Sequence, residues 1–341
     1  MKKSLVALAV LASFGGAAFA QSSVTLYGLV DQGIAKGNGG TAANVGGNGL
    51  DKSWRLQQAA SSRFGLRGNE DLGGGLSAQF QIEHRFTPDD GAQSGVMWAG
   101  RSWVQLTMAG VGSVNLGRQY LPTFWVQLKA DPFGWDGVGQ IGSMQNAGFA
   151  AVNSGAAGGG SSIRTANAVT FKSANFGGLS FEAQTGLSEA TQAGRNDSFN
   201  VIYKGGPVFV GVGMAQVNGG PATVNDNRLI TVTGAYDLGV AEVALNYAQA
   251  KVGGGRLTNK FWNVAATVNL AGGKLKTAYA ILDPNGANNK QKKFGLGYDY
   301  PLSKRTNLYA DLGVGNQDGR NAAGQTFSRN TTYQFGVKHL F

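Results

Sequence analysis

The sequence predicts an all-β fold, a 16-stranded antiparallel transmembrane β-barrel with an inward-folded third extracellular loop. Three observations predict it: apolar and polar residues alternate along most of the chain, the polar faces carry charges, and short turns alternate with longer loops. The composition agrees, because glycine is abundant (55 residues), proline is scarce (7) and cysteine is absent. Without cysteine the chain has neither disulfides nor thiolate chemistry.

The N-terminus predicts export. Two lysines precede an apolar stretch, Leu5–Phe14, that is too short to span a bilayer, and Ala18–Ala20 supplies an A-x-A cleavage site. We therefore expect a signal peptide at 1–20 and a single barrel domain at 21–341. An N-terminal membrane anchor is the alternative, but it would need about 20 apolar residues. Cleavage removes two lysines, so the formal net charge falls from +10 to +8.

Alternation is clearest between Leu76 and Phe86. One face holds Leu76, Ala78, Phe80, Ile82, His84 and Phe86, and the other holds Ser77, Gln79, Gln81, Glu83 and Arg85. A soluble sandwich would bury its apolar face and leave a polar surface. Here the polar faces carry repeated charges, namely Arg63, Arg67, Glu83, Arg85, Arg101, Lys172 and Glu182. Apolar residues facing lipid and charges facing a water-filled lumen explain both patterns.

The connections set the strand number. Seven short turns are visible at 69–75, 109–112, 175–178, 204–207, 237–240, 270–273 and 300–303. Longer loops lie at 36–51, 88–96, 119–163, 189–194, 219–225, 251–257, 283–290 and 318–328. Seven turns and eight loops make fifteen connections, hence sixteen strands. The short turns and both termini are expected on the periplasmic side.

The third loop, 119–163, is far longer than the others. A loop of this length inside a compact domain is usually functional. A sixteen-stranded barrel has room for it inside, where it would narrow the lumen.

The sequence contains no convincing motif for catalysis or cofactor binding. Gly137–Gly142 matches G-x-G-x-x-G, but it follows no predicted strand and opens no predicted helix. The two histidines, His84 and His339, fall on the lipid-facing phase, where interfacial side chains are normal. Asp131 and Asp136 in the third loop form the one carboxylate pair worth testing for acid–base work. We expect them to tune selectivity instead, and we expect no enzyme activity, catalytic residue, metal, cofactor or nucleic-acid partner.

Several segments resemble the general porins of Gram-negative bacteria, most closely the beta-proteobacterial group found in Neisseria, Bordetella and Burkholderia. The segments that carry the resemblance are Ser22–Asp31 (SSVTLYGLVD), Ser62–Leu76 (SRFGLRGNEDLGGGL), Leu116–Gln119 (LGRQ), Leu302–Tyr309 (LSKRTNLY) and Gly336–Phe341 (GVKHLF). They run through the whole mature chain in the family's order. The interior of the third loop does not match any family motif.

The resemblance implies a trimeric, water-filled pore in which wall arginines face the third loop across the narrowest point. Arg63 and Arg101 match the family's arginines, and Arg118 lies where the third loop begins. Arg67 and Arg85 are further candidates on the lumen phase. The expected function is passive diffusion of small hydrophilic solutes and ions. A channel specific for sugars or phosphate is the alternative, and a structural or adhesive barrel is a third possibility.

On the lumen-facing side of the predicted strands, basic residues outnumber acidic ones, which favours anions over cations in the pore. The bases are Arg63, Arg67, Arg85, Arg101, Arg164, Lys172, Lys274, Lys276, Lys293, Arg305 and Lys338, and the acids are Asp31, Glu83, Glu182, Glu242, Asp299 and Asp311. Inorganic and organic anions are therefore the expected solutes. Basic residues outside that phase, such as Lys251 and Lys260, are expected to meet outer-membrane lipids and lipopolysaccharide.

The C-terminal strand ends in phenylalanine. Tyr333 and Phe341 place aromatic residues at the two ends of an alternating segment. This pattern resembles the signal read by the outer-membrane insertion machinery, and both residues also fit the aromatic girdle of a membrane barrel.

Overall fold

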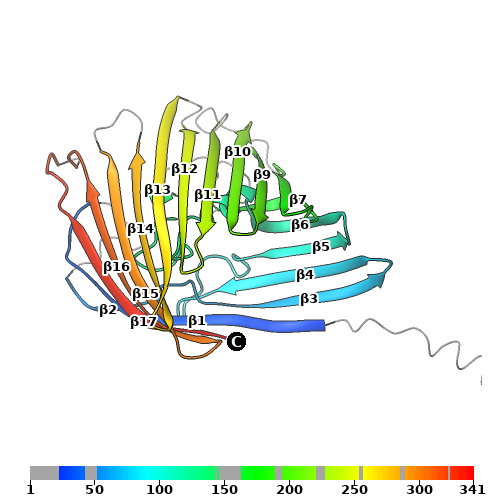
Figure 1. Ribbon diagram of the computed structural model, residues 1–341, viewed down its shortest axis with the longest axis horizontal. Coiled ribbons are helices and arrows are strands. Elements are labelled where there is room, and N and C mark those ends of the chain that lie inside the picture. The colour runs from blue at the N-terminus through cyan, green and yellow to red at the C-terminus, as the bar shows by residue number, and fades with distance from the viewer. Residues whose placement is uncertain are drawn as a thin grey trace, which may run out of the picture.

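The barrel has sixteen long antiparallel strands and one short strand in its first loop (Figure 1). The computed structural model describes residues 23–42, 52–142, 144–145, 163–188, 194–219, 227–252, 256–284, 289–321 and 323–341. The expected signal peptide, 1–20, lies outside these residues. The strands are β1 (Ser23–Gly37), β2 (Arg55–Gln57), β3 (Arg63–Gly73), β4 (Leu76–Arg85), β5 (Ser102–Met108), β6 (Gly112–Tyr120), β7 (Arg164–Ser173), β8 (Leu179–Gly186), β9 (Arg195–Gly205), β10 (Val208–Asn218), β11 (Arg228–Asp237), β12 (Ala241–Val252), β13 (Leu257–Leu270), β14 (Gly273–Asp283), β15 (Gln291–Pro301), β16 (Thr306–Gln317) and β17 (Asn330–Leu340).

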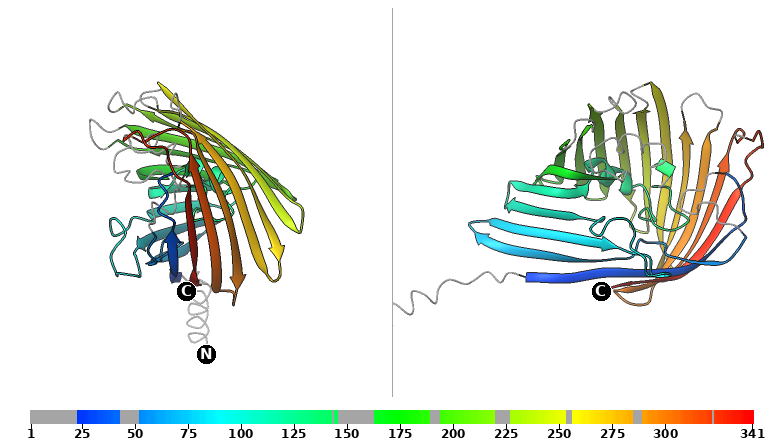
Figure 2. Two further views of the ribbon diagram at one scale, coloured as in Figure 1. Left: turned by 90° about the vertical axis from the view of Figure 1, so that its left-hand side faces the viewer. Right: turned by 180° about the vertical axis from the view of Figure 1, so that it is seen from behind.

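The first and last strands close the barrel. One part of β1 pairs with β3 and the rest pairs with β17, from Leu29 opposite Leu340 to Gly37 opposite Thr332. Figure 2 shows β1 and β17 side by side, although they stand at opposite ends of the chain. Closure matters because an open sheet edge in hydrocarbon would leave backbone N–H and C=O groups without hydrogen bonds.

The predicted connections are confirmed. Each of the seven predicted turns joins two long strands of the barrel, so the sixteen-strand count holds. The sequence did not predict the short strand β2. It pairs with residues 33–35 of β1, beyond residues 23–29, which pair with β3. Among the described residues, no helix is long and apolar enough to cross a membrane.

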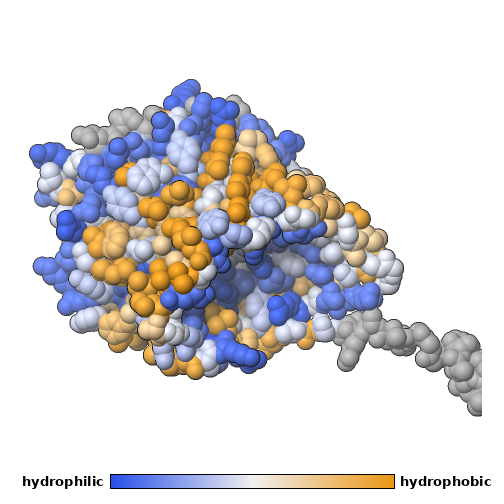
Figure 3. Space-filling view, viewed as in Figure 1, coloured by the Kyte–Doolittle hydropathy of each residue, from blue (hydrophilic) through white to orange (hydrophobic). Residues whose placement is uncertain are grey.

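The two faces of the wall differ as alternation predicts. Outward positions are apolar and exposed, as with Val210, Val212 and Leu245, and inward positions are buried and mostly polar, as with Asn246 and Asn263. Figure 3 shows apolar residues gathered over the outward faces of the strands, with hydrophilic residues along the upper edge. This is the distribution of a barrel that faces lipid outside and water inside.

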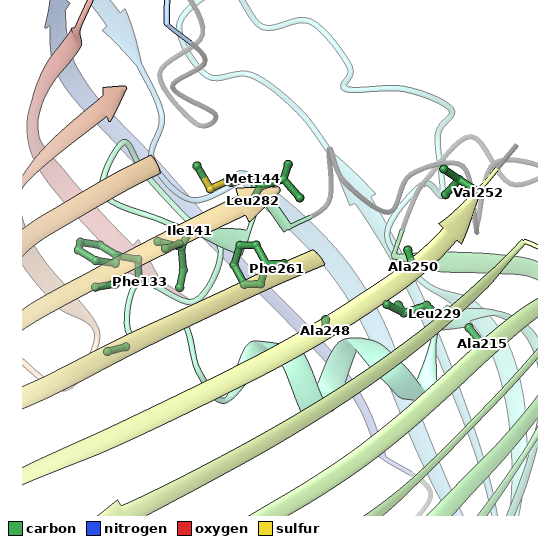
Figure 4. Close-up of a cluster of buried hydrophobic side chains, with 13 residues drawn as sticks. Phe133, Ile141, Met144, Ala215, Leu229, Ala248, Ala250, Val252, Phe261 and Leu282 are labelled. Carbon is green, nitrogen blue, oxygen red and sulfur yellow. The ribbon is translucent and has the colours of Figure 1, made fainter. Parts of the chain in front are cut away.

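One part of the inner wall is apolar and departs from this pattern. Phe261 and Leu282 lie on the inner face of β13 and β14 and are fully buried. They pack with Phe133, Ile141 and Met144 of the third loop, as Figure 4 shows. The loop therefore covers an apolar patch that would otherwise face water.

The C-terminal residue closes the seam between β1 and β17. Phe341 and Gly28 exchange two backbone hydrogen bonds, with N···O distances of 3.0 and 3.1 Å. A Cβ added to Gly28 would lie 2.2 Å from the Phe341 ring, so this close packing requires glycine. Tyr333 faces outward with half of its surface exposed.

Orientation can be tested with inserted tags. A tag after Gly324, in the last long loop, should be accessible on intact cells, and a tag after Gly272, in a two-residue turn, should not. Both glycines have positive φ angles, of 75° and 80°, and sit in comparable exposed connections. Antibody labelling of intact and permeabilised cells makes the measurement, and the reverse pattern would contradict the orientation.

Assembly should depend on Phe341. Deleting it removes the two hydrogen bonds to Gly28 and the ring that covers that glycine, so the amount of inserted, heat-modifiable protein should fall. Pores that do form should keep the wild-type conductance. Phe176→Ala is the matched control, because Phe176 is an equally exposed aromatic beside a short turn. Normal insertion of the deletion, or an equal defect in the control, would refute this role.

Candidate functional site: an arginine-lined cavity

The lumen contains a cavity of about 760 Å³ between the wall and the third loop. Six guanidinium groups line it, from Arg63, Arg67, Arg85, Arg101, Arg118 and Arg164. The carboxylates among its lining residues are Glu83 and Asp136. Six positive charges against two negative ones leave the cavity with a net charge of +4.

The arginines come from consecutive strands, β3 to β7, or from the residues beside them. Glu83 stands in their centre: Arg85 Nη2 lies 2.8 Å from Glu83 Oε1, and Arg63 Nε lies 3.8 Å from Glu83 Oε2. Arg101 donates a hydrogen bond of 3.1 Å to Gln81. One carboxylate thus holds two arginines in place, and their charges exceed its own.

Tyr120 organises the other side of the cluster. The guanidinium carbon of Arg164 lies 4.1 Å from the centre of the Tyr120 ring, and that of Arg101 lies 5.0 Å from it. The Tyr120 hydroxyl accepts hydrogen bonds from Arg164 and from Arg85 Nη2. The aromatic face and the hydroxyl stabilise three cations without neutralising any of them.

Aromatic rings of the third loop extend from Tyr120 along the cavity. Short helix α2 (Pro122–Leu128) begins directly after β6 and carries Phe124 and Trp125. Phe124 stacks on Tyr120 with ring centres 4.4 Å apart, and it meets Trp125 and Trp135 edge-on at 5.2 Å. We call Tyr120, Phe124, Trp125 and Trp135 the aromatic wall; all four line the cavity.

The loop is held against the opposite half of the barrel by buried polar groups. The side chain of Asn200 donates to Pro122 O (2.7 Å), that of Thr233 to Val126 O (2.7 Å) and that of Asn263 to Ala130 O (2.9 Å). These donors lie on β9, β11 and β13. They satisfy loop carbonyls that the lumen wall would otherwise leave without partners.

Asp131 shapes the loop. It is buried, and its carboxylate accepts hydrogen bonds from the backbone N–H groups of Phe133, Ile141 and Gly142 at 2.9 to 3.2 Å. Burial raises the pKa of the carboxyl, and these backbone hydrogen bonds oppose that rise. Asp131 is not among the residues that line the cavity.

Asp136 lines the cavity beside the arginines. Burial raises the pKa of its carboxyl to about 7, although Lys338, Arg63 and Arg85 favour the charged form. Asp136 therefore changes charge near neutral pH. The two third-loop acids, which the sequence grouped as a pair, occupy different environments, and only Asp136 meets the pore.

The structure brings together the five arginines that the sequence assigned to the constriction, and Arg164, which the sequence placed on the lumen side only, lies with them. Arg118 could not be assigned by alternation, since the pairing of β6 with β7 shifts register between Gly117 and Gln119. Sequence reasoning missed the aromatic wall. The sequence feature that could have revealed it is the group of aromatic residues 120, 124 and 125, at the end of β6 and just after it.

Within the described ranges, no group of three or more His, Cys, Asp or Glu side chains is arranged so that it could hold a metal ion.

A family model described as Gram-negative porin matches residues 7–321. The chain belongs to the Gram-negative porin family. This porin is 38% identical over 368 aligned residues to outer membrane porin protein 32 of Delftia acidovorans and 29% identical to an outer membrane porin protein of Bordetella pertussis, with all chains covered in full. Among solved structures, the anion-selective porin from Comamonas acidovorans matches with a TM-score of 0.82 and 30% identity, over 94% of this chain and 100% of that one.

These relatives confirm the beta-proteobacterial porin resemblance. The protein is an outer-membrane porin, a passive channel for small solutes and ions. Its relatives are channels and not enzymes.

Selectivity should depend on pH through Asp136. Lowering the pH from about 8 to about 6 neutralises this carboxyl and raises the net charge of the cavity from +4 to +5. One unit charge at about 10 Å in water changes the energies of chloride and of potassium by about 0.4 kcal/mol each, in opposite directions, so the chloride-to-potassium permeability ratio should rise about fourfold. Reversal potentials in a salt gradient measure this ratio. Asp136→Asn should hold the higher ratio at both pH values, and an unchanged pH response in that variant would exclude Asp136 as the source.

Proposed function

We propose that this porin is an anion-selective diffusion pore whose selectivity is set by the arginine-lined cavity. The observation that carries the proposal is the excess of six guanidinium groups over two carboxylates around one aperture. Fixed charges around a narrow aqueous aperture with low-dielectric walls raise the local potential by several kT and enrich counter-ions at least about tenfold. At about 0.1 M salt the field reaches about 10 Å, so the residues at the narrowest point dominate.

Acids elsewhere on the inner wall already have partners. Lys172 pairs with Glu182, Lys129 with Glu242, and Lys276 with Asp299 and Asp311. Asp31 is fully buried and accepts hydrogen bonds from Ala59 N, Ala60 N and Tyr309 Oη. By contrast, Arg101 and Arg164 donate hydrogen bonds to uncharged side chains, those of Gln81 and Tyr120. The uncompensated charge is therefore concentrated in the cavity.

The third loop narrows the pore in this proposal. Its hydrogen bonds to β9, β11 and β13 hold it against one half of the wall, and its aromatic residues face the arginines of the other half. The pore itself performs no chemistry. It keeps an aqueous path open and biases which ions use it.

The wider partners follow from the family and from the outer surface. We expect a homotrimer, delivered by the outer-membrane insertion machinery and surrounded by outer-membrane lipids and lipopolysaccharide. Lys251 and Lys260 lie on the outward phase near the long-loop ends of β12 and β13, where lipid phosphates would meet them.

Replacing Arg63 and Arg101 together by alanine should lower the chloride-to-potassium permeability ratio by about four- to sixteenfold at low salt, because two unit charges leave the aperture. The permeability to large neutral solutes should rise, since two long side chains are removed. Reversal potentials and liposome swelling measure these effects. Lys251 and Lys260 replaced together by alanine form the matched control, with the same change in net charge outside the pore. A wild-type pore that prefers potassium, or a control that shifts the ratio equally, would overturn the proposal.

A further inference from the structure

The cavity offers two kinds of surface, although attracting inorganic anions requires only one. Guanidinium groups supply positive charge, and the aromatic wall supplies flat apolar area beside them. The two surfaces meet at Arg101, whose guanidinium carbon lies 5.0 Å from the Tyr120 ring centre and 5.8 Å from that of Trp125. A chloride ion gains nothing from indole rings.

The four rings of the aromatic wall have different exposure. Phe124 is buried. Tyr120 is half-buried, and its ring packs against Phe124 at 4.4 Å and against Arg164 at 4.1 Å. These two rings therefore act as support. Trp125 and Trp135 are half-buried and still line the cavity, so they present the accessible ring surface.

The backbone at Trp135 is strained. Its φ is 64°, a left-handed conformation that is unfavourable for a bulky residue and favours glycine. Its ring lies so close to Gly142 that a Cβ there would approach ring atoms to 2.2 Å. Glycines at 134 and 137 flank it, yet a tryptophan occupies the strained position that favours glycine. Simple closure of the loop does not require an indole at this point.

From these observations we infer that the cavity holds a subsite for aromatic carboxylates, the class of benzoate. The carboxylate would lie against Arg85, Arg101 and Arg164, and the ring would lie against Trp125 and Trp135. This inference rests on the proposed anion-selective function and names a solute class for the same cavity. Weak binding suits a channel, because a solute must enter the site readily and also leave it.

Two acids of equal charge and similar size separate ring stacking from simple attraction. Benzoate and cyclohexanecarboxylate, added in turn to full-length protein in a planar bilayer, should both reduce the chloride current. Aromatic pairing adds about threefold to tenfold in affinity beyond area burial. We therefore expect half-block by benzoate at about three- to tenfold lower concentration. Equal block by the two acids would overturn the inference.

Variants locate the effect. Trp125→Leu and Trp135→Leu keep apolar bulk but remove the indole, so each should reduce the preference for benzoate towards unity. Trp262→Leu is the matched control, because Trp262 faces outward on β13 with 42% of its surface exposed. An equal loss in the Trp262 variant, or an undiminished preference in both cavity variants, would contradict the subsite. Should one cavity variant fail to insert, the other carries the test.

The same recordings keep the two proposals apart. Reversal potentials in potassium chloride alone report the selectivity of the pore before either acid is added. Preference for potassium would defeat the proposed function. Preference for chloride combined with equal block by the two acids would defeat only the aromatic subsite.

Discussion

Closure of the sheet in lipid is the constraint on which the rest of this structure depends. Hydrocarbon offers no hydrogen-bond partners, so every backbone group of the spanning strands must pair with a neighbouring strand. Pairing of β1 with both β3 and β17 meets this requirement. Sixteen strands then enclose a lumen too wide to be filled by wall side chains alone. The third loop and the long arginine side chains occupy part of this opening, and we propose that they give it selectivity.

The two halves of the barrel wall contribute different groups to the lumen. Strands β3 to β7 and their ends supply the six arginines, and strands β9 to β14 supply the hydrogen-bond donors and the apolar patch that hold the third loop. Each half is therefore adapted to one task. The loop begins at the arginine half, directly after β6, and crosses to the other half, which places its aromatic residues between the two.

Alternation and turn composition predicted the barrel from the sequence because both signals are local. Ala271 and Gly272, for example, form a two-residue turn between β13 and β14, and both have the positive φ angles that such a hairpin turn requires. The interior of the third loop could not be predicted in this way. Asp131 looks like a selectivity residue in sequence, but its partners are backbone groups up to eleven residues away. Phe261 and Leu282 break the polar phase of their strands, and this irregularity is the one sequence signal for the docking patch.

The apolar patch under the third loop has a consequence for the order of assembly. Phe133, Ile141 and Met144 of the loop pack against side chains that reach as far along the chain as Leu282 on β14. The docking surface therefore does not exist until the second half of the barrel is in place. The cavity beside the third loop is consequently completed after the wall, so an incomplete barrel encloses a wider lumen than the finished one.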